Sequence, residues 1–298
     1  MARVLRIGAA AAFFAVAACS GTSQAQPSPE TLARAADFAI NNVTTSLYHE
    51  FGHLLIDQFE WPVLGREENA ADTIMTMLLL DEGDAADIAA DAVRGYMLAS
   101  ARYGETLPEN HDFKGEHELE VQRGFLMACL LVGSDRDDYE DLAEEIGLGD
   151  NRTDACREDA RLAQRSWDAL KAHVAGSAGD DRRSRRGRDD DDDDDEDDDD
   201  DDDRAPSGAT MRVVYEDPGE TYRQIADLMK ERRLLENVAD ALSSRFPLRR
   251  EATIKAELCG DDDAYYSGRQ DEITLCYEYT QFYFDLIADP ENAGAGMI

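Results

Sequence analysis

The segment from Leu47 to Asp72, LYHEFGHLLIDQFEWPVLGREENAAD, constrains this chain more than any other part of its sequence. It contains the pattern H-E-x-x-H, in which His49 and His53 are four residues apart and Glu50 follows the first. Residues four apart lie on one face of a helix, so both imidazoles can reach one metal ion. The glutamate lies close enough to act on a water bound to that metal. The spacing therefore predicts a helix with two zinc ligands and a general base.

A third ligand distinguishes a metal centre from two ordinary helix histidines. Asp57 lies on the same stripe of the helix, but one further turn along, roughly 6 Å from His53. Glu68 is better placed. The helix can run about six residues past His53, turn at Pro62 and Gly65, and return over a similar distance. We therefore expect Glu68 to be the third ligand.

The residues around Glu68 support this assignment. Asp72 follows one turn later in the pattern E-x-x-A-D, where it can accept a hydrogen bond from a ligating imidazole and fix its tautomer. Small Ala70 and Ala71 would let the two helices approach closely. Glu67 is the nearest rival ligand, and we expect it to be a solvated acid in the first helical turn.

Residues 1–18, MARVLRIGAAAAFFAVAA, are predicted to form a signal peptide. Arg3 and Arg6 precede an apolar run of about a dozen residues, which is too short to span a bilayer. Residues 16–19, VAAC, resemble the lipobox of bacterial lipoproteins, whose cysteine becomes the lipidated first residue. Ordinary cleavage after Ala25 is the alternative. We expect an exported, periplasmic protein that touches the membrane only through a lipid on Cys19.

The cysteine count agrees with lipidation of Cys19. The chain has five cysteines, and an exported protein rarely leaves one free. Without Cys19, four remain, which allow three pairings. Cys259 and Cys276 flank a turn-rich segment between two strand-like runs, so in an antiparallel hairpin they would lie nearly opposite each other, within disulfide range. That leaves Cys129 to pair with Cys156.

Hydrophobic periodicity predicts a mostly helical first part and strands only in the last third. Ser28 is the expected cap of the first helix, and a second helix carries the H-E-x-x-H pattern. Further helices are expected in ENAADTIMTMLLL, GDAADIAADAVRGYMLASARYGE, EHELEVQRGFLMACLLVG, CREDARLAQRSWDALKAHV and ETYRQIADLMKERRLLENVADALSSRF. Strands are expected in MRVVYE, ATIKAEL and EITLCYEY, and TQFYFDLIA is predicted to be a closing helix or a strand extension.

Residues 176–209 are predicted to form a disordered loop, because like charges this dense cannot pack. The loop contains fifteen consecutive acidic residues, 189–203. It lacks the spaced ligands and the turn glycine of a calcium loop, although calcium binding is a minor alternative. The formal net charge is −36, and removing this run still leaves −21. Such a protein repels nucleic acid and anionic membranes, so its substrate is expected to be neutral or positive.

The motifs together resemble a known family. H-E-x-x-H followed by E-x-x-A-D is similar to the gluzincin metallopeptidases. More closely, YHEFGHLLID, PVLGREENAAD, EHELEVQR and ITLCYE resemble a family of bacterial metallopeptidase-like proteins classed as a domain of unknown function. The similarity covers Pro27 to about Leu286 and is interrupted by the acidic run. Asp263 stands where that family has asparagine.

The resemblance implies a zinc-dependent peptidase that acts on a peptide or protein substrate. Zn²⁺ held by His49, His53 and Glu68 would keep a fourth position for water. Glu50 would take a proton from that water and pass it to the leaving amine. An oxyanion partner is also needed, and each candidate has a structural alternative; the candidates are His117, Tyr265, Tyr266 and Tyr277.

The expected fold is α+β: one mostly helical, zincin-like metallopeptidase domain, residues 27–298, with a small antiparallel sheet. In such peptidases a sheet with a substrate-aligning edge strand usually precedes the H-E-x-x-H helix. Here the strands come from the far end of the chain, so we expect them to pack beside residues 43–58. The alternative function is a non-catalytic, zinc-binding or protein-interaction lipoprotein of the envelope.

Overall fold

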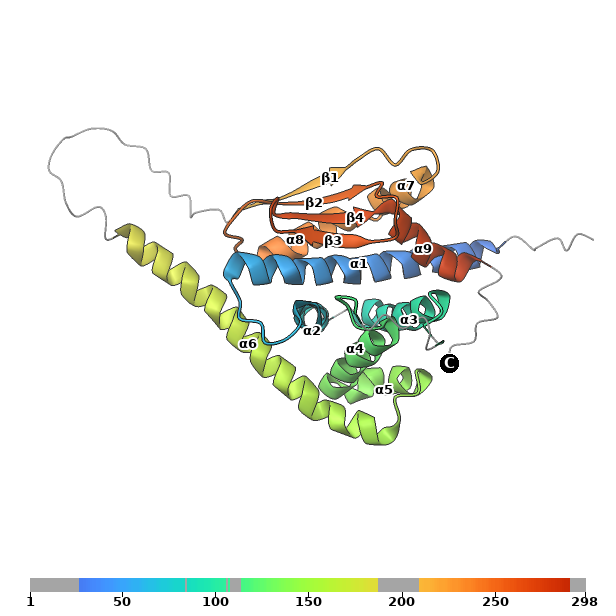
Figure 1. Cartoon of the computed structure of the whole chain (residues 1–298), viewed down its shortest axis with the longest axis horizontal. Helices are drawn as coiled ribbons and strands as arrows, with labels where there is room; N and C mark the ends of the chain where they lie inside the picture. The colour runs from blue at the N-terminus through green and yellow to red at the C-terminus, as the bar shows by residue number, and fades with distance from the viewer. Residues whose placement is uncertain (1–26, 84, 106, 108–113, 187–208, 290–298) are drawn as a thin grey trace, which may run out of the picture.

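The central element of the molecule is a long helix, α1, Pro29–Phe59. The structure is a computed structural model that describes residues 27–289, apart from residues 84, 106, 108–113 and 187–208. In it, α1 lies between a layer of helices and a layer that contains the sheet (Figure 1). The predicted cap is confirmed, because Ser28 Oγ accepts a hydrogen bond from the Thr31 N–H at 3.1 Å. Every residue from 47 to 56 is buried, as expected of a helix packed on all sides.

Two helices were expected between residues 27 and 59, and one continuous helix is found. The polar residues in its middle do not break it, because each finds a partner. The hydroxyls of Thr44 and Thr45 donate to carbonyls one turn earlier, at 2.7 and 3.0 Å. Asn42 donates to the carbonyls of Phe38 and Asp91, at 2.9 and 3.2 Å. Local hydrogen bonding therefore preserves the helix through a polar stretch.

The layer on one side of α1 is entirely helical in the described residues (Figure 1). Its elements are α2, Glu67–Leu80; α3, Ala86–Arg102; α4, Glu120–Ser134; α5, Arg136–Glu145; and α6, Asp150–Arg186. Helix α5 was not predicted; its cap is Asp135, which accepts a hydrogen bond from the Asp138 N–H at 3.2 Å. The predicted disulfide between Cys129 and Cys156 is confirmed, and it joins α4 to α6.

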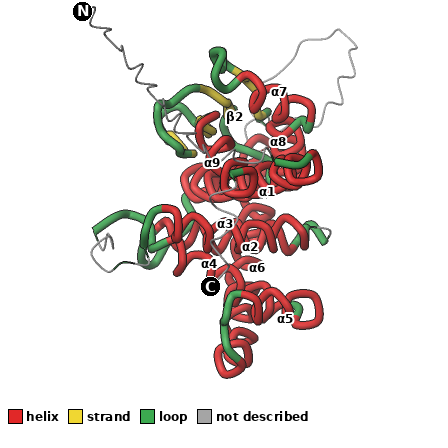
Figure 2. Tube along the Cα trace, turned by 90° about the vertical axis from the view of Figure 1, so that its right-hand side faces the viewer, coloured by secondary structure: helices red, strands yellow, loops and turns green. Residues whose placement is uncertain are grey.

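The layer on the other side of α1 holds a four-stranded sheet and three helices (Figure 2). The elements are β1, Met211–Tyr215; α7, Arg223–Glu231; α8, Leu234–Arg245; β2, Ala252–Glu257; β3, Ala264–Ser267; β4, Glu272–Cys276; and α9, Tyr277–Ala288. The strand order is β1-β2-β4-β3. The chain therefore passes from β2 to the outer strand β3 before β4 fills the place between them.

The sheet is mixed, and the predicted antiparallel hairpin of β2 and β4 is wrong. Both β1 with β2 and β2 with β4 pair in parallel, and only β3 with β4 is antiparallel. The segment expected to be a turn contains β3, which takes the antiparallel position instead. The disulfide between Cys259 and Cys276 is nevertheless confirmed. It joins the carboxyl ends of parallel strands, where Glu257 pairs with Cys276.

The edge strand β3 and its neighbour β4 pack beside α1, as the sequence predicted for strands from the far end of the chain. A polar cluster at the end of α1 fastens this contact. Arg250 donates to Asp57 Oδ2 at 2.6 Å and to Asp271 Oδ1 at 2.7 Å. Tyr266 of β3 donates its hydroxyl to the same Asp57 oxygen at 2.9 Å. Asp57 is thus part of the joint between helix and sheet.

The segment 176–209 differs in part from the expected disordered loop, because α6 continues through it to Arg186. The sequence places Asp181 four residues before Arg185, a spacing that favours a helix. Residues 187–208, with the acidic run, lie outside the described residues, as do the predicted signal peptide and Cys19. None of the described helices combines the length and the apolar character that a membrane span requires.

Replacing Cys259 and Cys276 together by alanine should lower the free energy of unfolding by roughly 3 kcal/mol. The disulfide closes the loop between these two residues in the unfolded chain, and a loop of that length gives a stabilisation of about this size. Thermal unfolding followed by circular dichroism would measure the change. An unfolding temperature equal to that of the unaltered protein would show that this disulfide does not stabilise the sheet.

Candidate metal centre

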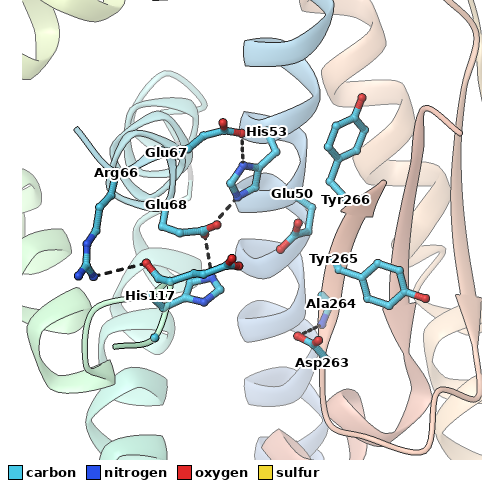
Figure 3. Close-up of a pocket in the computed structure, with 12 residues that line it drawn as sticks. Glu50, His53, Arg66, Glu67, Glu68, His117, Asp263, Ala264, Tyr265 and Tyr266 are labelled. Atoms are coloured by element: carbon cyan, nitrogen blue, oxygen red, sulfur yellow. Dashed lines mark hydrogen bonds and ion pairs between the residues drawn. The ribbon is translucent and has the colours of Figure 1, made fainter. Parts of the chain in front are cut away.

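Three side chains from α1 and α2 converge on one point. His49 Nε2 lies 3.1 Å from Glu68 Oε2, and His53 Nε2 lies 3.2 Å from the same oxygen. The two Nε2 atoms are 3.2 Å apart. The three atoms thus form a nearly equilateral triangle. The structure brings together the residues that the sequence proposed as ligands, and Figure 3 shows two of them, His53 and Glu68, facing each other.

The chain between the two helices explains this convergence. After α1 ends, the segment through Pro62 reverses direction, and Gly65 adopts a φ of 115°, which L side chains rarely accept. The helices then approach closely where Gly52 faces Ala71. A Cβ on Gly52 would lie only 3.2 Å from Ala71 Cα. The glycine inside the H-E-x-x-H pattern and the alanine of E-x-x-A-D therefore set the distance between the two ligand-bearing helices.

The donor set fits a divalent metal ion. His49 Nδ1 lies 2.8 Å from Asp72 Oδ1, and His53 Nδ1 lies 2.8 Å from Glu67 Oε1. Carboxylates only accept, so these contacts place a proton on each Nδ1. In the neutral rings both Nε2 atoms then direct lone pairs toward the Glu68 oxygen, and three acceptors this close repel one another unless a proton or a metal cation lies among them.

The size of the triangle also fits zinc. Ligands at 2.0–2.1 Å from a tetrahedral zinc are roughly 3.3 Å from one another. Burial alone would lower the pKa of His49, but the contacts with Asp72 and Glu68 raise it to about 9. The surrounding carboxylates therefore favour positive charge at this point.

Asp72 is itself held by a buried arginine. Arg123 of α4 donates to both Asp72 oxygens, at 3.0 and 2.8 Å, and its guanidinium lies 4.8 Å from the centre of the Tyr96 ring. Burial acts to raise the pKa of Asp72, yet the charge of Arg123 and the contact with His49 hold it well below its usual range. The carboxylate stays ionised in the core and orients His49.

Two residues of this arrangement were not predicted. Glu67 was expected to be solvated, but it contacts His53, although its side chain remains 52% exposed. Arg123 had no role assigned. Its signal in the sequence is a single arginine that directly precedes the apolar run GFLMACLLVG, where an unpaired charge would be costly to bury.

Glu50 lines a cleft of about 610 Å³ between the ligand triangle and strand β3. The residue is 6% exposed, and no described residue gives its carboxylate a hydrogen bond. Burial raises its pKa above that of an ordinary glutamate, while the charges of His49 and His53 act against this shift. Figure 3 shows the side chain directed toward the cleft. A buried carboxylate with a raised pKa suits a group that accepts and returns a proton.

His117 is the oxyanion candidate that lies at the centre. Its Nε2 is 2.8 Å from Glu68 Oε2, and its side chain is 49% exposed. The loop that carries it is fastened by Arg66, which contacts the Glu116 carbonyl at 3.5 Å and Glu118 Oε1 at 3.7 Å. The donor atoms of His49, Glu68 and His117 lie within 4.8 Å of one another.

The tyrosine candidates differ in position. Tyr265 and Tyr266 line the cleft. The Tyr266 hydroxyl is already bonded to Asp57. Tyr277 is fully buried and donates its hydroxyl to the Glu216 carbonyl at 2.8 Å, away from the centre.

Comparison with protein families agrees with this geometry. A model of the DUF4344 family, described as "Putative metallopeptidase", matches residues 13–171 and 215–295, which together are most of the chain. The chain belongs to this family. The match leaves out residues 172–214, which include the acidic run. The family resemblance that the motifs suggested is thereby confirmed. No curated protein and no solved structure matches the chain.

Replacing Asp72 by asparagine should weaken the binding of a divalent metal ion about 10- to 100-fold, because the carboxylate no longer orients the His49 ring. Replacing Glu67 by glutamine should have a smaller effect, since Glu67 is half exposed and its contact is weakened by water. Competition with a chromophoric chelator would measure both affinities. Equal, unchanged affinities in the two variants would contradict an orienting role for these carboxylates.

Proposed function

We propose that the protein is a zinc-dependent metallopeptidase that hydrolyses peptide bonds in the cell envelope. One observation carries the proposal: the triangle of His49, His53 and Glu68 acceptor atoms beside the buried carboxylate of Glu50. Two imidazoles and one carboxylate, with room for a fourth ligand, are typical of catalytic zinc. The cysteines that a structural zinc site would use are bound in disulfides. These disulfides also support an oxidising compartment.

Each residue of the centre has a part in this reaction. Zinc, when bound, would polarise the peptide carbonyl and lower the pKa of a water molecule. Glu50 accepts the proton of the attacking water and delivers it to the leaving amine. Asp72 and Glu67 hold the two imidazoles in their orientation. His117, which reaches the centre from its own loop, donates a hydrogen bond to the negative charge that develops on the carbonyl oxygen.

Strand β3 offers a template for an extended peptide. The Cys276 N–H donates to the Asp263 carbonyl at 3.0 Å, and Tyr265 pairs with Thr274. Bonded pairs alternate along an antiparallel ladder, so the backbone groups of Ala264 and Tyr266 face the open edge. No described strand pairs with that edge. A substrate strand that adds to β3 would pass along the cleft beside Glu50.

Replacing Glu50 by glutamine should leave zinc binding intact and lower the rate of peptide cleavage by about 10²- to 10⁴-fold, because the amide cannot accept the proton. Zinc content and cleavage of a peptide library would be measured on both proteins. Equal cleavage by the two proteins would exclude Glu50 as the base, and unaltered protein without zinc would contradict the metal centre.

One observation favours a different function. His117 lies close enough to the donor atoms of His49 and Glu68 to act as a further ligand beside His53, which would close the site and make it a non-catalytic zinc site. Replacing His117 by alanine distinguishes the catalytic zinc site from the closed, non-catalytic one. If His117 is the fourth ligand, its replacement would weaken zinc binding strongly. In a peptidase we expect zinc affinity to change little while kcat falls, and alanine at His173, an exposed histidine of α6, should change neither.

A further inference from the structure

The cleft contains carboxylates that the proposed reaction does not use. Glu50 is assigned to proton transfer, Glu68 to the metal and Glu67 to His53. Asp263 and Glu116 also line the cleft, the first from the start of β3 and the second from the loop before α4. Neither has a part in the chemistry derived above.

The position of Asp263 is fixed from several sides. Its Oδ1 accepts a hydrogen bond from the Ala264 N–H at 2.8 Å, and its carbonyl accepts from the Cys276 N–H at 3.0 Å. Cys276 is in turn bound to Cys259 by a disulfide. Glu278 accepts hydrogen bonds from the backbone N–H groups that follow β2, at 3.3 and 2.9 Å. The loop that presents Asp263 is therefore ordered before any ligand arrives.

The second oxygen of Asp263 is left without a donor from any described residue. Burial raises the pKa of this carboxyl, and the nearby Asp261 and Asp262 act in the same direction. The Ala264 N–H and the charge of His117 act in the opposite direction and favour the ionised form. In Figure 3 the side chain lies on the β3 side of the cleft, across from His117. This edge of the cleft thus carries a carboxyl group that no lysine or arginine of the described residues pairs with.

The opposite charge is scarce throughout this cleft. Arg66 is the one lysine or arginine among the described residues that line it, and its guanidinium is occupied by Glu118 and the Glu116 carbonyl.

A second observation marks the cleft as a ligand site in its own right: the Glu50 carboxylate is more than nine-tenths buried, is directed into it and has no hydrogen bond from the described residues.

We propose that the substrate is a basic peptide, with a lysine or arginine side chain whose cationic end binds Asp263 while its backbone runs along β3. This inference rests on the proposed peptidase function and adds the class of substrate. The ordered loop reduces the entropy lost when the ion pair forms. Glu116 adds to the negative field in the same cleft, and the acidic body of the protein favours the approach of a cationic peptide.

The test uses alanine-based octapeptides that carry a single lysine at each position in turn, matched by peptides with norleucine or glutamate at the same position. Cleavage is measured with the zinc-loaded full chain. Equilibrium binding is measured separately by fluorescence anisotropy with the Glu50→Gln protein, so that affinity is obtained even if no bond is cut. The variants are Asp263→Asn, Asp263→Glu and, as a matched control, Asp240→Asn, an exposed aspartate on α8 that lines another cavity.

The best lysine peptide should exceed its norleucine match roughly three- to fivefold in both measurements, as expected for a partly exposed ion pair. Asp263→Asn should reduce this ratio to within about twofold, Asp263→Glu should keep part of it, and Asp240→Asn should keep all of it. The ratio should also fall at high salt.

Two results separate this inference from the proposed function. In the first result, the full chain cuts no peptide, but the Glu50→Gln protein binds lysine peptides with a preference that needs Asp263. The proposed peptidase function is then wrong, and the preference for a basic peptide ligand is retained. If peptides are cut with no lysine preference, or with one that Asp263→Asn retains, the inference is wrong and the peptidase stands. Absence of both cleavage and peptide binding overturns both.

Discussion

The structure depends on a helix whose polar residues lie in the core. From residue 47 to residue 56, α1 is buried on every side, yet this stretch includes His49, Glu50 and His53. Buried polar groups are costly unless they have partners, so the surrounding helices must supply them. Asp72 and Glu67 supply partners for the two Nδ1 atoms. What is left over is the set of acceptors that a metal ion would satisfy, with the base beside it.

The same constraint explains the outer parts of the site. A buried Asp72 needs a cation of its own, and Arg123 reaches it from α4. The small residues Gly52 and Ala71 let the two helices meet closely enough for Glu68 to face both imidazoles. On the far side, the pairing of Arg250 with Asp57 and Asp271 holds β3 against α1, and this forms the second wall of the cleft. Helix packing and polar pairing thus define the cleft together.

Local patterns in the sequence were sufficient to predict which side chains of α1 and α2 converge. The four-residue spacing of His49 and His53 and the turn at Gly65 follow from helix geometry and from the conformations open to glycine, so Glu68 and Asp72 could be placed. The sheet could not be predicted in this way. The run GDDDAYYSGRQ has the composition of a turn, and only pairing with β4 makes part of it a strand.

Contacts between segments that are distant in the chain could not be predicted from the sequence either. The parallel pairing of β2 with β4 and the contact of Arg123 with Asp72 depend on how the helices pack, which no local pattern encodes. The continuity of α1 depends on partners that are distant in the chain. One of them is the carbonyl of Asp91, which accepts a hydrogen bond from Asn42. The cysteine pairs were predicted correctly although the expected hairpin was wrong, because the carboxyl ends of parallel neighbours also lie within disulfide range.

The central claim is that His49, His53 and Glu68 hold one zinc ion. X-ray absorption at the zinc edge of the metal-loaded full chain tests it directly, because the spectrum reports the first ligand atoms and the imidazole rings behind them. The account predicts four nitrogen and oxygen ligands at about 2.0 Å, with the outer scattering of two imidazoles and no sulfur. A spectrum with sulfur ligands, or with no imidazole scattering, would contradict it.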